Sequence, residues 1–121
     1  MQTDKAQPNL IVDVTFEFAK KIILFVEQLE KDRKYVIANQ LIKSGTSIGA
    51  NVRKAQNAES IADFIHKMKI AAKEADETNY WLLLCKEVYS TLGTDELLVK
   101  CESISKILSK IILSLKFKSK Q

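Results

Sequence analysis

Near its middle the chain reads Leu41-Ile42-Lys43-Ser44-Gly45-Thr46-Ser47-Ile48-Gly49-Ala50-Asn51-Val52-Arg53-Lys54-Ala55, with two of the three glycines and no acidic residue. The Ser-Gly and Gly-Thr-Ser steps are turn signals, which favour a kink or short loop near Ser44-Gly45-Thr46. Apolar and small residues at helical spacing favour one long helix instead. They are Ile37, Leu41, Ser44, Ile48, Val52 and Ala55. We expect the unbroken helix and keep the kink as the alternative.

Glycine inside a helix costs about 1 kcal/mol relative to alanine, so two glycines require either a break or a closely packed neighbour. Gly45 and Gly49 are four residues apart and share one side of the expected helix. Small residues also fill the middle of the next apolar stretch, at Ala71 and Ala75. We predict that these four residues are close-packing positions, with the alanines as candidates to face the glycines.

The chain has 121 residues, of which 46% are hydrophobic and 28% charged, with a single proline. This length fits one domain, residues 1–121, and so few turn-forming residues indicate long helices. No signal-peptide pattern is visible, and no apolar run approaches the roughly 20 residues that cross a bilayer. We therefore expect a cytoplasmic protein with no membrane association.

Apolar periodicity predicts an all-α, antiparallel, up-down-up-down four-helix bundle. The expected helices cover about residues 9–30, 33–57, 61–90 and 95–117. Residues 1–8 are polar and are expected to be a frayed lead-in.

Capping residues define the expected helix boundaries. Asp32 is a candidate N-cap for the second helix, and Ser60 with Asp63 forms a Ser-x-x-Asp start signal for the third. Gly93 is expected to close the third helix in a left-handed conformation, and Thr94 to cap the fourth.

The net charge of +4 is unevenly distributed. Residues 33–58 hold five basic residues and no acid, and residues 110–121 hold four lysines and no acid. We take these residues as candidates for binding nucleic-acid phosphates, without aromatic side chains between them for base stacking. They are Arg33, Lys34, Lys43, Arg53, Lys54, Lys110, Lys116, Lys118 and Lys120. The alternative is a solvated surface, or pairing with the acidic helices of a neighbouring subunit.

Several catalytic chemistries have no matching motif. The glycine pair lacks the Lys-Ser/Thr that completes a phosphate-binding loop, and His66, the single histidine, has no nucleophile motif around it. Cys85 and Cys101 lie in apolar helical patterns without a metal-ligand partner at suitable spacing, and we expect two buried, reduced thiols. We expect no enzyme activity, no cofactor and no metal.

Three segments together resemble one bacterial family. They are residues 40–52, Ala58-Glu59-Ser60 with Asp63-Phe64-Ile65-His66-Lys67, and Glu74-Ala75 with Glu77-Thr78 and Tyr80-Trp81-Leu82. The chain resembles, over about residues 16–113, the four-helix-bundle proteins encoded in intervening sequences of 23S ribosomal RNA genes, often labelled S23 ribosomal proteins. The resemblance does not imply a structural component of the ribosome.

The resemblance implies a ring-like homopentamer. Accessory variability proteins of diversity-generating retroelements are similar in fold, form basic pentameric barrels, and bind nucleic acid and a reverse transcriptase. Many relatives have an acid shortly after the Asn-Ile/Val pair, whereas this chain has Asn51-Val52-Arg53-Lys54.

We hypothesise a non-enzymatic homo-oligomer that binds structured RNA or other nucleic acid. The alternative is a scaffold or accessory subunit that docks another protein through apolar residues outside the core stripes, such as Phe16, Ile23 and Tyr80.

Overall fold

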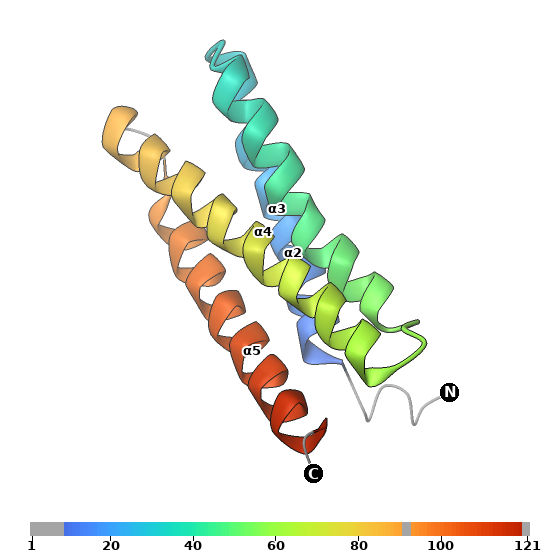
Figure 1. Cartoon of the computed structure of the whole chain (residues 1–121). Helices are drawn as coiled ribbons and strands as arrows, with labels where there is room; N and C mark the ends of the chain where they lie inside the picture. The colour runs from blue at the N-terminus through green and yellow to red at the C-terminus, as the bar shows by residue number, and fades with distance from the viewer. Residues whose placement is uncertain (1–8, 91–92, 120–121) are drawn as a thin grey trace.

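The computed structural model describes residues 9–90 and 93–119 and consists of four antiparallel helices (Figure 1). They are α2 (Leu10–Lys31), α3 (Tyr35–Ala55), α4 (Ile61–Val88) and α5 (Asp95–Ser119). Each helix packs on its neighbours in sequence, and α5 returns to pack on α2. This arrangement confirms the predicted all-α four-helix bundle. The expected lead-in at residues 1–8 lies outside the described residues.

The inward stripe of each helix forms one continuous core, as the apolar periodicity predicted. Its largest fully buried side chains are Phe18, Ile22 and Leu29 from α2, Leu41 and Ile48 from α3, Met68 and Leu82 from α4, and Ile104 and Leu108 from α5. Burial of a side chain of this size stabilises the fold by about 1.5–3 kcal/mol.

Helix α3 runs without interruption through Ser44-Gly45-Thr46, which confirms the continuous helix. The hydroxyls of Thr46 and Ser47 donate to the carbonyls of Ile42 and Lys43, one turn earlier, at 2.6 Å in both cases. Their polar groups are therefore satisfied within the helix, and the turn signals of this stretch do not end it.

The two glycines of α3 allow α2 to approach closely. A Cβ atom on Gly45 would lie 2.8 and 2.9 Å from the Cγ2 and Cγ1 atoms of Ile22. A Cβ atom on Gly49 would lie 3.3 Å from both the carbonyl oxygen and the hydroxyl oxygen of Thr15. Close packing at Gly45 and Gly49 is thus confirmed, with α2 as the neighbour.

The suggestion that Ala71 and Ala75 face the glycines is wrong. Both alanines are fully buried on α4, but successive helical residues point about 100° apart, so that Gly45 faces α2 while Ser44 faces α4. The hydroxyls of Ser44 and Thr78 hydrogen-bond across the α3–α4 contact at 2.9 Å. Both residues are fully buried.

Ala75 instead meets α5. The Cys101 thiol donates to the Ala75 carbonyl at 3.2 Å, a contact that requires the two helices to lie close together. Cys85 and Cys101 are both buried thiols without a disulfide. Burial raises the pKa of Cys85 to about 11 and that of Cys101 to about 12, so neither thiol is reactive near neutral pH.

The α2–α3 link is a Schellman motif built without glycine. The Lys34 amide donates to the Leu29 carbonyl at 2.8 Å and the Arg33 amide to the Glu30 carbonyl at 2.9 Å, while Arg33 has a left-handed φ of 62°. Asp32 is the C-cap of α2, and the N-cap of α3 is Lys34. The prediction that Asp32 caps α3 is therefore wrong, because two further residues are needed to complete the turn.

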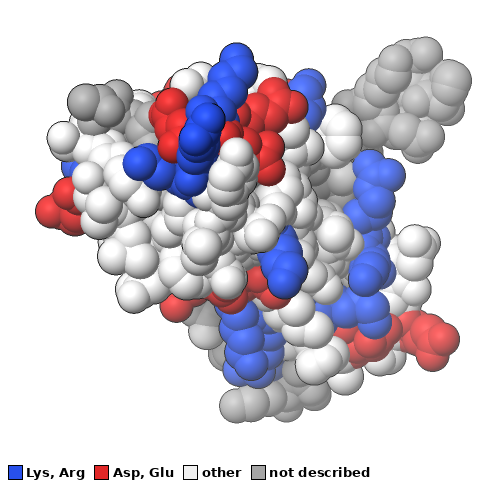
Figure 2. All heavy atoms as spheres, turned by 90° about the horizontal axis from the view of Figure 1, so that it is seen from above, with Lys and Arg blue, Asp and Glu red and all other residues white. Residues whose placement is uncertain are grey.

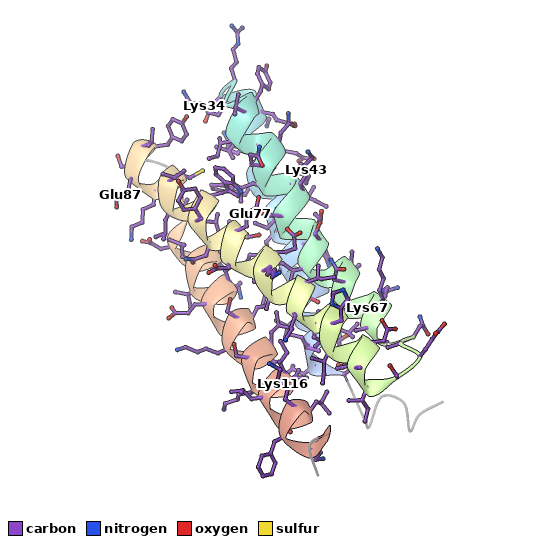
Figure 3. All side chains as sticks on the ribbon, viewed as in Figure 1. Lys34, Lys43, Lys67, Glu77, Glu87 and Lys116 are labelled. Atoms are coloured by element: carbon purple, nitrogen blue, oxygen red, sulfur yellow. The ribbon has the colours of Figure 1, made fainter. Side chains whose placement is uncertain are left out.

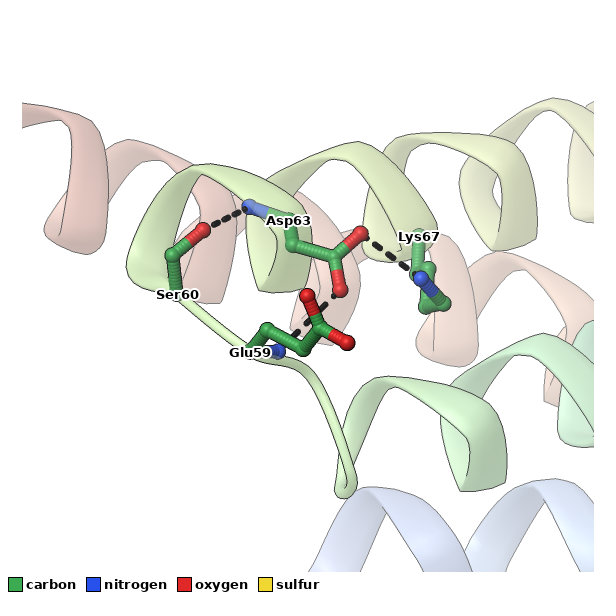
Figure 4. Close-up of polar contacts among 4 residues, drawn as sticks. All are labelled: Glu59, Ser60, Asp63 and Lys67. Carbon is green, nitrogen blue, oxygen red and sulfur yellow. Dashed lines mark hydrogen bonds and ion pairs between the residues drawn. The ribbon is translucent and has the colours of Figure 1, made fainter.

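Helix α4 begins as the Ser-x-x-Asp signal predicted (Figure 4). The Ser60 hydroxyl accepts from the Asp63 amide at 3.0 Å, and the Asp63 carboxylate accepts from the Glu59 amide at 3.2 Å. The Lys67 ammonium, 2.7 Å from the carboxylate, is the main cause that lowers the pKa of Asp63 below 3.8. The lowered pKa of Asp63 stabilises the folded state above about pH 3.8, and this stabilisation is lost as the pH falls through the folded-state pKa.

The α4–α5 link differs in part from the expectation. Helix α4 ends at Val88 with Tyr89 as its C-cap, so Gly93 does not close it, and Thr91-Leu92 lie outside the described residues. Thr94 lies directly before α5, at the position expected for its N-cap. Its carbonyl accepts from the Leu98 amide at 2.9 Å.

We predict that Gly45→Ala lowers the free energy of unfolding by about 1 kcal/mol, because overpacking against Ile22 outweighs the gain in helix propensity. Gly49→Ala, which has no contact below 3 Å, is expected to be closer to neutral. In the Ile22→Ala background, which removes both Cγ atoms, Gly45→Ala should cost less or stabilise. Urea denaturation of the four variants measures this coupling, and strictly additive effects would contradict it.

We predict that Arg33→Gly raises the free energy of unfolding by about 0.5 kcal/mol. It relieves about 1–2 kcal/mol of left-handed strain, and the greater freedom of the unfolded chain offsets part of the gain. Arg33→Ala removes the same side chain but keeps the strain, so it should show no gain. Equal stability of the two variants in thermal and urea denaturation would argue against strain at this position.

Candidate nucleic-acid interface

The antiparallel topology separates the basic candidates into two groups. Helices α3 and α5 run in the same direction, so Arg53 and Lys54 lie at the end of the bundle where α5 carries Lys110, Lys116 and Lys118. We call this the terminal end, because the described chain begins and finishes there. Arg33 and Lys34 lie at the opposite end, in the link between α2 and α3. Lys43 lies along α3 between the two ends of the bundle, as its position relative to Lys34 in Figure 3 shows. Lys120 lies outside the described residues.

Charge is polarised along the bundle axis. The terminal end, residues 10–20, 46–75 and 104–119, carries ten basic and five acidic residues. The opposite end, residues 21–45, 76–90 and 93–103, carries seven basic and nine acidic residues. Figure 2 views the opposite end and shows basic and acidic side chains next to each other around a largely uncharged area. A phosphate backbone is therefore attracted more strongly to the terminal end.

Some cations of the opposite end are engaged within the bundle, as Lys67 and Lys106 are at the terminal end. The Lys34 ammonium lies 4.8 Å from the centre of the Tyr89 ring. This cation–π contact joins the start of α3 to the end of α4. Lys86 pairs with Asp95 at 3.0 Å. These contacts favour a structural role for Lys34 over a role in phosphate binding.

A groove of about 420 Å³ between α4 and α5 is also unfavourable for phosphate. Asp76 and Glu102 contribute carboxylates to its walls, beside Asn79. Like charges repel, so these carboxylates disfavour the binding of a phosphate in this groove.

The terminal end has a further cation, Lys69, outside the two basic segments of the sequence. Lys69 of α4 lies beside Lys116 of α5, and its hydrogen bond and positive charge lower the pKa of Lys116. The acids Glu74, Asp76 and Glu77 follow Lys69 on α4 and give this part of the helix an acidic character. The sequence could have indicated Lys69, because it lies five to eight residues before these carboxylates on the same helix.

The terminal end also has an exposed aromatic side chain among its lysines. Phe117, between Lys116 and Lys118, is 67% exposed, as is Leu113 one turn earlier. The expectation that no aromatic residue interleaves these lysines is wrong. The Lys-Phe-Lys sequence was itself the available signal.

Other apolar side chains are exposed on α2 and α4. Phe16 and Ile23 project from α2, and Tyr80 from α4, as the apolar positions outside the core stripes suggested. Trp81 is half-buried, and its indole nitrogen donates to Glu77 at 3.0 Å.

The described residues contain no cluster of three His, Cys, Asp or Glu side chains that could hold a metal ion. Over the same part of the chain, none of the four helices is both long enough and apolar enough to span a bilayer.

Comparison with known proteins places this fold in a family. The model for the 23S rRNA-intervening sequence proteins matches residues 8–110. The chain belongs to this family. A solved structure from Bacteroides thetaiotaomicron VPI-5482, a protein of unknown function from the S23 ribosomal protein family, is similar at 40% identity and a TM-score of 0.80. The similarity covers 84% of this chain and 97% of that one. No curated protein matches the chain.

Proposed function

We propose that this 23S rRNA-intervening sequence protein is a non-enzymatic, homo-oligomeric bundle that binds structured RNA or other nucleic acid through its terminal end. The supporting observation is the excess of basic residues there, which come from all four helices. They include Arg53 and Lys54 from α3, Lys69 from α4, and Lys110, Lys116 and Lys118 from α5.

Counterion release would drive such binding. Each phosphate neutralised on a duplex contributes about −0.9 to the slope of log affinity against log salt concentration, so a footprint of five cations gives a slope of about −4.5. Lysine contacts to phosphates position a nucleic acid without distinguishing its sequence, and the proposed recognition is therefore one of shape.

A cytoplasmic setting fits this proposal. RNA is the proposed partner, and the two buried cysteines form no disulfide, as is usual for proteins of a reducing compartment.

We predict that reversing two charges at the terminal end, Lys54→Glu with Lys110→Glu, lowers the affinity for a labelled RNA hairpin at least ten-fold at low salt and reduces the salt slope by about 2. All the replaced side chains are exposed, so folding is preserved. The matched control is Arg33→Glu with Lys43→Glu, which changes the net charge equally and should have a smaller effect. Fluorescence anisotropy over a salt series measures both affinities.

An equal loss in the two double variants would mean that net charge alone attracts the RNA, and would contradict a site at the terminal end. Absence of binding by the unaltered protein at low salt would exclude the nucleic-acid function itself.

Exposed apolar side chains support self-association and, as a second candidate function, a scaffold that docks another protein. Phe16 is 54% exposed and Ile23 is 42% exposed on α2, two turns apart on one side of the helix. Aromatic and aliphatic side chains of this kind form the centres of subunit interfaces. The family resemblance suggests a ring of five subunits.

We predict that the protein sediments as an oligomer and that Phe16→Glu with Ile23→Glu shifts it toward the monomer, because burying two carboxylates without partners is costly. The control is Leu24→Glu, an exposed residue that points about 100° away from Ile23. Analytical ultracentrifugation gives the masses. A monomeric unaltered protein would contradict the oligomer, and a double variant that remains fully assembled would place the interface elsewhere.

A further inference from the structure

We propose that the outer face of the last three turns of α5 is a site for unpaired nucleotides, in which Phe117 stacks on a base and Lys110 and Lys116 contact the flanking phosphates. The site extends the proposed nucleic-acid function and rests on it. It adds a ligand class, a single-stranded segment next to structured RNA, that phosphate contacts alone would not select.

Helical spacing places Lys110 and Phe117 in one row, and Lys116 projects about 100° around the helix from Phe117, toward Lys69 of α4. Lys106, Lys110, Leu113 and Phe117 follow each other at steps of four, three and four residues, which keeps them on one side of α5. All four are exposed. The opposite side of the helix is anchored in the core by Ile104 and Leu108, both fully buried, so this face is presented from a firmly packed element.

The local field favours a polyanion. Residues 104–119 contain four lysines and no acid. The carbonyl end of a helix carries about half a negative charge, which these lysines more than offset. Lys69 of α4 adds a fifth cation beside Lys116, and its proximity lowers the pKa of Lys116. Holding two ammonium groups together costs free energy that a bound phosphate would recover.

The aromatic ring would allow this site to distinguish a single-stranded nucleic acid from other polyanions. An exposed ring stacks on any base, since every base has a π face, and a base in a closed duplex is not accessible to it. Leu113 extends the apolar surface by one turn. Phe16, the other strongly exposed phenylalanine, has a carboxylate nearby, because Lys20 beside its ring pairs with Glu17. A polyanion is therefore less favoured at Phe16 than at Phe117.

The test compares two labelled probes, a single-stranded oligoadenylate and a blunt-ended RNA duplex of equal nucleotide number, with the full-length protein. Phe117→Ala should weaken oligoadenylate binding about five-fold or more and leave duplex binding within about two-fold. Phe117→Trp should retain the single-strand affinity. The matched control is Tyr35→Ala, which removes an exposed aromatic side chain after a lysine at the opposite end and should change neither affinity.

A direct readout uses oligoadenylate that carries a fluorescent adenine analogue, whose emission falls when it stacks on an aromatic ring. The protein should quench this emission, and Phe117→Ala should abolish the quenching. Unchanged quenching and affinity in Phe117→Ala, with RNA binding otherwise intact, overturn this site but leave the proposed function standing.

Two further outcomes also overturn the site. If the unaltered protein binds neither probe at low salt, the proposed function fails with it. If Phe117→Ala weakens binding to phosphatidylserine vesicles but not to oligoadenylate, the face is a membrane-contact surface instead.

Discussion

The contact between α2 and α3 at the two glycines sets the geometry of the whole bundle. Gly45 lies against the side chain of Ile22 and Gly49 against the backbone of Thr15. The helices are so close that a Cβ atom on either glycine would lie within 3.3 Å of an atom of α2. This approach orients α3 so that Ser44 faces α4 and bonds to Thr78 in the core. Two glycines cost about 2 kcal/mol of helix propensity, which the packing of buried side chains such as Ile22 and Ile48 offsets.

The same antiparallel arrangement produces the electrostatic character of the protein. Because alternate helices run in the same direction, the basic C-terminal turns of α3 and α5 lie at one end, and α4 adds Lys69 there. The opposite end mixes both signs, with Lys34 over Tyr89 and Lys86 paired with Asp95. An axial charge gradient would orient the bundle on a phosphate surface before any specific contact forms.

Local signals predicted the helices and several of their ends well, because capping and periodicity act within a few residues. Ser60 caps α4 through Asp63 as expected, and Ser44 lies in the core despite its turn propensity. Signals failed where two structures competed for the same residue. Asp32 could cap either adjoining helix, and the Schellman turn through Arg33 assigns it to α2. Gly93 suits a left-handed cap, but α4 ends before reaching it.

The sequence was sufficient to predict four amphipathic helices, a continuous α3, a close-packing role for Gly45 and Gly49, and two basic segments. Each of these features depends on the spacing of residues along one helix. The packed bundle alone revealed that the glycines face α2, that Ala75 meets Cys101, and that Lys69 lies beside Lys116. These pairings depend on the rotation of each helix about its axis. That rotation is set by how all four helices share one core, and no single segment contains it.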